Sequence, residues 1–272
     1  MPDWQGKVVL VTGGSGGLGR AIAAAFAARG ARVVIAARHA EALERAAAEL
    51  RGQGFDVTAI VADVTQQESV DALVAQIVER FGRLDVLVNN AGRSSRRAVL
   101  DTTPEDFQAL MELNLLAVVR LTRAAAPHLL RTGGHVVNIG SLAGKSAPRW
   151  MGAYAASKFA LSAYSQQLRL ELAPQGLHVL LVCPGPIARD EPRTSDSERA
   201  REDESGVPPS ARQPGAGVRV KAMRPEALAE RIVRACERRQ PELVVPGKAR
   251  LLFAISALWP RLGDWLVRRM TR

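Results

Sequence analysis

The chain has few of the residue patterns that bind metal ions or nucleic acids. Its two cysteines, Cys183 and Cys236, fall in separate predicted elements, and its four histidines form no His-Glu-x-x-His pattern. Aromatic residues make up only 4% of the chain and do not alternate with basic residues to form a stacking platform. We therefore expect no metal site and no nucleic-acid partner.

Two further patterns are missing. The N-terminal segment, residues 1–7, lacks the basic, apolar and small-residue succession of a secretion signal, so we expect a cytoplasmic protein. Acidic residues are too few to balance the basic ones, which leaves a net charge of +10. That charge would suit an anionic partner, such as a phosphorylated cofactor or an anionic membrane surface.

Short apolar runs alternate with longer helical patterns along the 272 residues, which is typical of a parallel sheet with helices on both faces. We expect a single doubly wound α/β domain, a Rossmann-type three-layer sandwich with a seven-stranded parallel sheet. The predicted strands are Lys7–Val11, Arg32–Ala36, Asp56–Val61, Leu84–Val88, Gly134–Ile139, His178–Val182 and Glu242–Val245. The predicted helices are Gly17–Arg29, Ala40–Arg51, Gln66–Phe81, Pro104–Leu130, Gly152–Ala173 and Pro225–Arg238.

Some helix starts carry local signals. Thr65 with Glu68 three residues later predicts a capping box, and Pro104 and Pro225 stand where a first-turn proline is tolerated. Residues 1–247 should form the catalytic domain. Within it, residues 189–220 are polar and predict either an active-site lid or a disordered insert.

A glycine-rich turn, Thr12-Gly13-Gly14-Ser15-Gly16-Gly17-Leu18-Gly19, follows the first predicted strand and opens a helix. Unpaired N–H groups at a helix start attract phosphate, and glycine lets the backbone approach it. The string fits two glycine spacings, Gly14-x-Gly16-x-x-Gly19 and Gly13-x-x-x-Gly17-x-Gly19. The first is the common dinucleotide fingerprint and the second is a different spacing, and the pattern alone does not choose between them.

The end of the second predicted strand carries Arg38, nineteen residues after Gly19, and no carboxylate. A carboxylate at this point binds the ribose hydroxyl of NAD, whereas an arginine accommodates the 2′-phosphate of NADP. The sequence therefore favours NADP(H), with NAD(H) as the alternative.

Tyr154 and Lys158 lie four positions apart in a predicted helix, with Ser141 thirteen residues upstream. Residues at this spacing have Cβ atoms about 5–6 Å apart, so an ammonium group would lower the tyrosine pKa from its usual ~10. Ser141 could then hold a substrate oxygen. Taken alone, the pair is weak evidence, because a packed tyrosine with a solvated lysine one turn later is commonplace.

Taken together, these motifs resemble the short-chain dehydrogenase/reductase family in its compact single-domain form, across nearly the whole chain. Thr12-Gly13-x-x-x-Gly17-x-Gly19 is similar to its cofactor turn, and Asn114, Ser141, Tyr154 and Lys158 match its catalytic tetrad. With Arg38, the expected cofactor residues are Gly13, Ser15, Gly16, Gly17, Leu18, Gly19, Asp63, Val64, Asn90, Ala91, Gly92, Tyr154, Lys158, Pro184, Gly185 and Ile187.

The match has two departures. The family often has a threonine four residues after the glycine of its Pro-Gly turn, where this chain has Arg189. The basic residue that many NADP-using members carry inside the glycine turn is also missing, since Ser15 and Gly16 stand there. The NADP prediction therefore depends on Arg38.

The resemblance implies an oxidoreductase that transfers a hydride between nicotinamide and a small-molecule carbonyl or secondary alcohol. Tyr154 would exchange the proton, and Asn114 would kink its helix and hold a water in a relay through Lys158. The family also implies homodimers or homotetramers paired through the helices that bear Asn114 and Tyr154. The competing hypothesis is a non-catalytic dinucleotide-binding sensor or scaffold.

Residues 248–272 form a basic, amphipathic C-terminal tail with Trp259 and Trp265 flanked by arginines. Its apolar run is shorter than the ~20 residues that span a bilayer, and Pro260 interrupts it. The tail could pack on the protein or on a neighbouring subunit, or it could lie in a membrane interface. Membrane contact would favour a lipophilic keto substrate.

Overall fold

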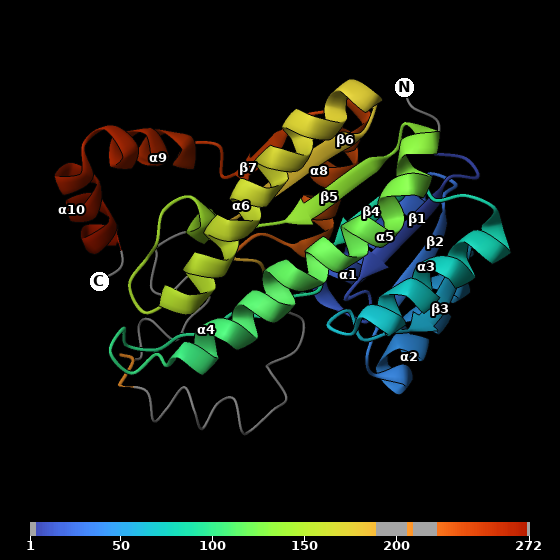
Figure 1. The fold of residues 1–272 in the computed structure, drawn as a ribbon, viewed down its shortest axis with the longest axis horizontal. Coiled ribbons are helices and arrows are strands. Elements are labelled where there is room, and N and C mark those ends of the chain that lie inside the picture. The colour runs from blue at the N-terminus through green and yellow to red at the C-terminus, as the bar shows by residue number, and fades with distance from the viewer. Residues whose placement is uncertain (1–3, 189–205, 209–221, 271–272) are drawn as a thin grey trace.

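A single parallel sheet organises the chain. The computed structural model describes residues 4–188, 206–208 and 222–270. All pairings of its seven strands are parallel, in the order β3-β2-β1-β4-β5-β6-β7 (Figure 1). The strands are β1 Val8–Thr12, β2 Arg32–Ala37, β3 Val57–Val61, β4 Val86–Asn89, β5 His135–Ile139, β6 His178–Pro184 and β7 Glu242–Val245. The predicted fold class is confirmed.

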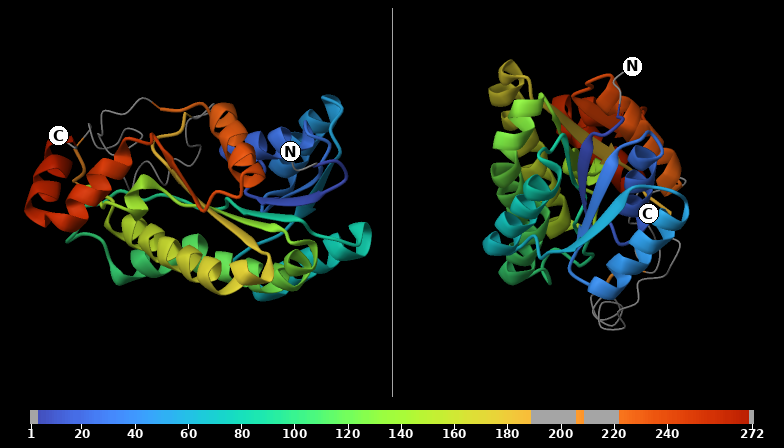
Figure 2. Two further views of the ribbon diagram at one scale, coloured as in Figure 1. Left: turned by 90° about the horizontal axis from the view of Figure 1, so that it is seen from above. Right: turned by 90° about the vertical axis from the view of Figure 1, so that its right-hand side faces the viewer.

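Helices cover both faces of the sheet, as the two views of Figure 2 show. One face packs against α1 Gly17–Ala27, α2 Ala40–Gly52 and α8 Pro225–Glu237. The other packs against α3 Gln67–Phe81, α5 Ala117–Thr132 and α6 Gly152–Leu172. Neighbouring strand residues serve opposite faces: Val9 and Val11 join the first core, and Val8 and Leu10 the second. The strands are mostly apolar because both faces of the sheet are buried.

The helix predicted as Pro104–Leu130 is three segments in one run. An α-helix, α4 Pro104–Met111, continues into a π-helical turn, η1 Glu112–Leu116, and then into α5. The π-helical turn contains Asn114, a poor helix former, so the helix is disturbed where the sequence predicts it.

The predicted capping box at Thr65 is wrong. Helix α3 begins at Gln67 without a side-chain cap, and the Thr65 hydroxyl instead donates to Asp63 Oδ1 at 2.7 Å. The capping box is instead formed at α4, by Thr103 and Asp106. Pro104 takes the first position of that helix, as predicted. A capping box depends on where the helix begins, which the residue pattern alone does not determine.

The two unusual segments differ in what the structure describes. The polar segment 189–220 lies outside the described residues except for 206–208. Its flanks meet, because Ala188 N–H donates to Met223 O at 2.8 Å. The C-terminal tail forms two helices, α9 Ala249–Leu258 and α10 Pro260–Met270.

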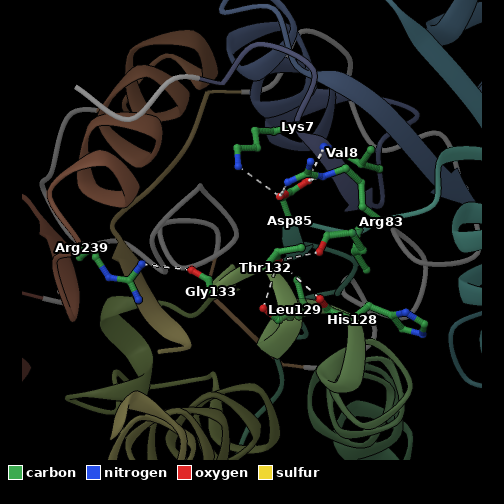
Figure 3. A network of polar contacts seen from close by, with 10 residues as sticks. Lys7, Val8, Arg83, Asp85, His128, Leu129, Thr132, Gly133 and Arg239 are labelled. Atoms are coloured by element: carbon green, nitrogen blue, oxygen red, sulfur yellow. Dashed lines mark hydrogen bonds and ion pairs between the residues drawn. The ribbon is translucent and has the colours of Figure 1, made fainter. Parts of the chain in front are cut away.

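Asp85 ties together the amino-terminal ends of β1 and β4 (Figure 3). Its buried carboxylate accepts Val8 N–H at 2.9 Å and two hydrogen bonds from the Arg83 guanidinium, and the Lys7 ammonium lies 3.6 Å away. Burial acts to raise the pKa of Asp85, but these donors outweigh it and lower the pKa. This network anchors the end of the sheet opposite the candidate site.

A buried histidine pair lies at the same end of the sheet. His135 Nδ1 and His178 Nδ1 are 2.8 Å apart, and His178 Nε2 lies 2.8 Å from Gln240 O. Because a carbonyl only accepts, His178 must carry its proton on Nε2, and His135 must then donate from Nδ1. Burial and the neighbouring His178 lower the pKa of His135 to about 3, and burial lowers that of His178.

This pair should make the protein less stable in acid. Both groups are held neutral when folded, so the unfolded chain binds more protons once the pH falls below the ordinary histidine value of ~6.5. The free energy of unfolding should therefore fall as pH drops below ~6.5, by up to ~1.4 kcal/mol per pH unit for each proton that the unfolded chain binds in excess. For His135 this fall continues toward about pH 3.

Urea unfolding at a series of pH values measures this slope. The double variant His135→Leu/His178→Leu should have a shallower slope than the wild type between pH ~6 and ~4. His39→Gln, which changes an exposed histidine, should keep the wild-type slope. Equal slopes for the wild type and the double variant would contradict the prediction.

Candidate active site

The turn after β1 is held by Thr12 and Asn90, which come from two neighbouring strands. The Thr12 hydroxyl donates to Val88 O at 3.2 Å and accepts the N–H groups of Asn90 and Ala91 at 3.1 Å. Asn90 Nδ2 donates in return to Thr12 O at 2.9 Å. This exchange fixes the glycine turn against the segment that follows β4.

Different features of the structure require glycine at different positions of this turn. A Cβ at Gly19 would lie 2.1 Å from Gly13 O, and a Cβ at Gly14 would lie 2.6 Å from Ile35 Cβ, so neither position has room for a side chain. Gly13 has a φ of +65°, which favours glycine. Gly17 also has a positive φ, +49°, but a side chain at Gly16 or Gly17 would meet only open space.

That open space lies at the start of α1. Gly16 caps this helix without a side-chain hydrogen bond, and its first turn contains no acidic residue. Buried Leu18 and Gly19 anchor the turn, while Ser15 is half-buried. The backbone N–H groups and the positive end of the helix dipole attract anions here, and no carboxylate in the first turn competes with them. The start of α1 is therefore suited to the pyrophosphate of a dinucleotide.

Arg38 and Asp63 follow the carboxyl ends of β2 and β3, beside this turn. Arg38 is exposed, and Asp63 is close enough to feel its charge. Burial acts to raise the pKa of Asp63, but hydrogen bonds from Thr65 and the charge of Arg38 outweigh it and lower the pKa. Val64 is buried next to Asp63 and so anchors the turn beside which an adenosine group could lie.

Asn114 is fully buried in the π-helical turn, and its amide group is well satisfied. Its Nδ2 donates to Arg93 O and to Ser157 Oγ, and its Oδ1 accepts Arg93 N–H, each at 3.0 Å. A Cβ at Gly92 would lie 2.9 Å from Asn114 Oδ1 and 3.7 Å from Lys158 Nζ. The two polar side chains therefore border the same space beside Gly92.

Lys158 is buried on α6, with only 6% of its surface exposed. Its Nζ donates to Ile139 O at 2.8 Å and lies 5.9 Å from the centre of the Tyr154 ring, as the helical spacing predicts. Burial lowers the pKa of Lys158 to about 8. The ammonium form still dominates at neutral pH and places a positive charge beside the tyrosine.

Ser141 follows β5 and begins a short 3-10 turn, η2 Leu142–Gly144. Its Oγ accepts Ala143 N–H at 3.1 Å, which leaves the hydroxyl hydrogen available to another acceptor. The turn packs closely on α6, because a Cβ at Gly144 would lie 2.6 Å from Lys158 O. Ser141 is therefore fixed relative to the helix that bears Tyr154 and Lys158.

The remaining predicted cofactor residues lie at the carboxyl end of β6 and in the segment after it. Pro184 ends that strand, and Gly185 N–H donates to Val245 O at 2.7 Å. Ile187 forms a parallel bridge with Met223. Arg189, where the family often has threonine, lies outside the described residues.

The structure adds groups that the motifs did not single out. Ser157 is fully buried, and its Oγ accepts a hydrogen bond from Asn114 Nδ2 and donates one to Tyr154 O at 2.8 Å. Its position directly before Lys158 was the available signal. Ile139 O and the backbone of Arg93 carry no signal, because any residue supplies the same carbonyl and N–H groups. Within the described residues, no cluster of histidine, cysteine and carboxylate side chains could hold a metal ion.

Comparison with known families shows to which family this chain belongs. A family model described as short chain dehydrogenase matches residues 7–200. The chain belongs to the short-chain dehydrogenase family. The resemblance noted from the sequence is thereby confirmed, and members of this family are oxidoreductases that act on alcohols and ketones.

Short-chain dehydrogenase relatives match nearly the whole chain. YxnA, an uncharacterized oxidoreductase of Bacillus subtilis (strain 168), is 34% identical and covers 97% of this chain and 72% of its own. A crystal structure from Burkholderia phymatum in complex with NAD has a TM-score of 0.82 at 25% identity, covering 96% of both chains. A short-chain dehydrogenase from Streptomyces avermitilis has a TM-score of 0.76 at 34% identity, covering 98% of this chain and 99% of its own.

Proposed function

We propose that this protein is an NADP(H)-dependent oxidoreductase that transfers a hydride between nicotinamide and a carbonyl or secondary alcohol, with Tyr154 as general acid and base. The observation that carries the proposal is the position of the buried Lys158 ammonium. It lies beneath the Tyr154 ring and borders the same space as Asn114. Burying an ammonium group costs free energy, and a lysine that served only the fold could keep this group in solvent.

The nicotinamide dinucleotide, when bound, supplies or accepts the hydride. The chain's part is to hold the substrate oxygen and to move its proton. In the reductive direction, hydroxyl groups of Ser141 and Tyr154 donate to that oxygen as negative charge develops on it, and Tyr154 gives up its proton.

Lys158 and Asn114 support this transfer in different ways. The Lys158 ammonium stabilises the phenolate of Tyr154 and so lowers its pKa. Asn114 Oδ1, which borders the space beside Gly92 and Lys158 Nζ, is positioned to hold a water that returns a proton from solvent. The amide is fixed for this task by Arg93 and Ser157.

Exposed apolar residues support the proposed homodimer or homotetramer. Leu116 on η1 and Phe159 and Leu170 on α6 are large and exposed, and they lie on the segments that bear Asn114 and Tyr154. The cytoplasmic location and the division at residue 247 remain predictions from the sequence.

Tyr154→Phe tests the catalytic assignment. Turnover should fall by a factor on the order of 100 to 10,000, because the variant loses its acid and base group. NADPH should still bind, because the aromatic ring and Lys158 remain. The wild type is first screened by NADPH oxidation against ketones, β-keto thioesters and long-chain keto compounds.

Tyr164→Phe is the matched control, since Tyr164 is the only other tyrosine and lies on the same helix. It should retain most of the activity. Loss of activity in Tyr164→Phe alone, or more than a few per cent of activity in Tyr154→Phe, would refute the role of Tyr154. Binding of NADPH without turnover of any carbonyl by the wild type would favour a cofactor sensor.

Arg38→Asp tests the cofactor preference. The change removes the proposed phosphate partner and adds a carboxylate suited to a ribose hydroxyl, so the NADPH to NADH ratio of kcat/KM should fall by about 10-fold or more. Arg45→Asp makes the same change of charge on the exposed side of α2 and should leave the ratio unchanged. An equal ratio in the wild type and Arg38→Asp would show that Arg38 does not bind the cofactor.

A further inference from the structure

Helices α9 and α10 form a hairpin at one end of the molecule, beyond the sheet and α6 (Figures 1 and 2). The two helices pack closely, because a Cβ at Gly263 would lie 2.6 Å from Ser256 Cα. No residue of α9 and only Gly263 of α10 is fully buried. The two helices therefore pack against each other, but most of their apolar side chains are still exposed.

Large apolar side chains gather on this hairpin. Among the described residues, six of the thirteen large apolar residues that are exposed lie between positions 251 and 270. They are Leu251 (68% exposed), Leu258 (69%), Trp259 (59%), Leu262 (46%), Trp265 (49%) and Met270 (40%). Single exposed apolar residues are ordinary, but a group confined to one short hairpin indicates a binding surface.

Most of the charged residues of α10 lie on a different face from its apolar residues. Leu262, Trp265, Leu266 and Met270 follow one face at helical spacing. Arg261, Asp264 and Arg268 follow another and are exposed. Arg269 projects between Trp265 and Leu262 on the apolar face, where its guanidinium is 5.3 Å from the Trp265 ring centre.

The charge of the hairpin selects its partner. Positions 248–272 contain six basic residues and one acidic residue, Asp264. In a symmetric contact between two copies the same patch meets itself, so these cations would face each other. Anionic lipid headgroups instead attract arginine, while tryptophan prefers the boundary between headgroups and acyl chains.

We propose that the α9–α10 hairpin docks this protein on the surface of anionic membranes, with its apolar face in the lipid interface. Leu258, Trp259, Leu262 and Trp265 enter the boundary with the acyl chains, and the flanking arginines contact the headgroups. No described helix is long and apolar enough to cross a bilayer.

Docking would also bear on the substrate. Phe253 and Ala249 of α9 pack with Leu142, the residue after Ser141, on the cluster of Leu181, Cys183 and Val244. The base of the hairpin therefore lies beside the candidate catalytic serine. A docked protein would hold that site near the lipid, which favours a lipophilic carbonyl substrate; this step, unlike docking itself, rests on the proposed function.

Flotation of the full-length protein with lipid vesicles tests the docking, in the absence of cofactor and substrate. The wild type should float with phosphatidylcholine vesicles that contain phosphatidylglycerol, and much less with phosphatidylcholine alone. Because no turnover is measured, the result does not depend on the proposed chemistry.

Two hairpin variants separate the apolar and the charged contributions. Trp259→Ser/Leu262→Ser/Trp265→Ser should abolish flotation. Arg261→Gln/Arg268→Gln should weaken partitioning by about fivefold for each charge removed. Val99→Ser/Leu100→Ser, which changes two exposed apolar residues elsewhere, should float like the wild type. Circular dichroism confirms that each variant is folded.

Two results would overturn the proposal. The first is a wild type that stays unbound with anionic vesicles. The second is equal flotation of the wild type and the apolar variant. If the wild type stays unbound and the apolar variant forms a smaller oligomer in analytical ultracentrifugation, the hairpin is a contact between copies.

Discussion

The burial of one ammonium group constrains the geometry around the candidate active site. Lys158 Nζ lies inside the protein, and the structure gives it a hydrogen bond to Ile139 O at 2.8 Å. A buried cation is costly unless it is paired, so the surrounding elements have to supply oxygen atoms at fixed positions. The end of β5, the turn η2 and the π-helical turn η1 all meet at α6 around this group.

The sheet order explains why these elements meet. The chain builds β1, β2 and β3 toward one edge, then crosses to β4 and builds toward the other. At the change of direction, the carboxyl ends of β1 and β4 lie side by side, and ligands bind at such a point in open parallel sheets. Thr12 and Asn90 join the two strand ends there, while Asp85 anchors the opposite end. The glycine turn and the proposed Tyr154 site therefore share one edge of the sheet.

Much of this arrangement follows from the sequence, because strands buried on both faces and glycines in close contact leave clear patterns. The seven strands were predictable for this reason, and the proximity of Tyr154 and Lys158 followed from the helical repeat. The Thr65 cap was mispredicted, since Asp63 accepts the same hydroxyl and helix α3 begins two residues later. The roles of Ile139 O and the Arg93 backbone were not predictable, because they depend on tertiary position and not on side-chain identity.

The central claim is that Lys158 sets the acidity of Tyr154, and the pH dependence of alcohol oxidation tests it most directly. The measurement compares kcat/KM of the wild type and Lys158→Met at saturating dinucleotide over a range of pH. With the ammonium removed, the apparent pKa at which activity rises should move up toward the ~10 of an ordinary tyrosine. An unchanged apparent pKa in Lys158→Met would contradict the account.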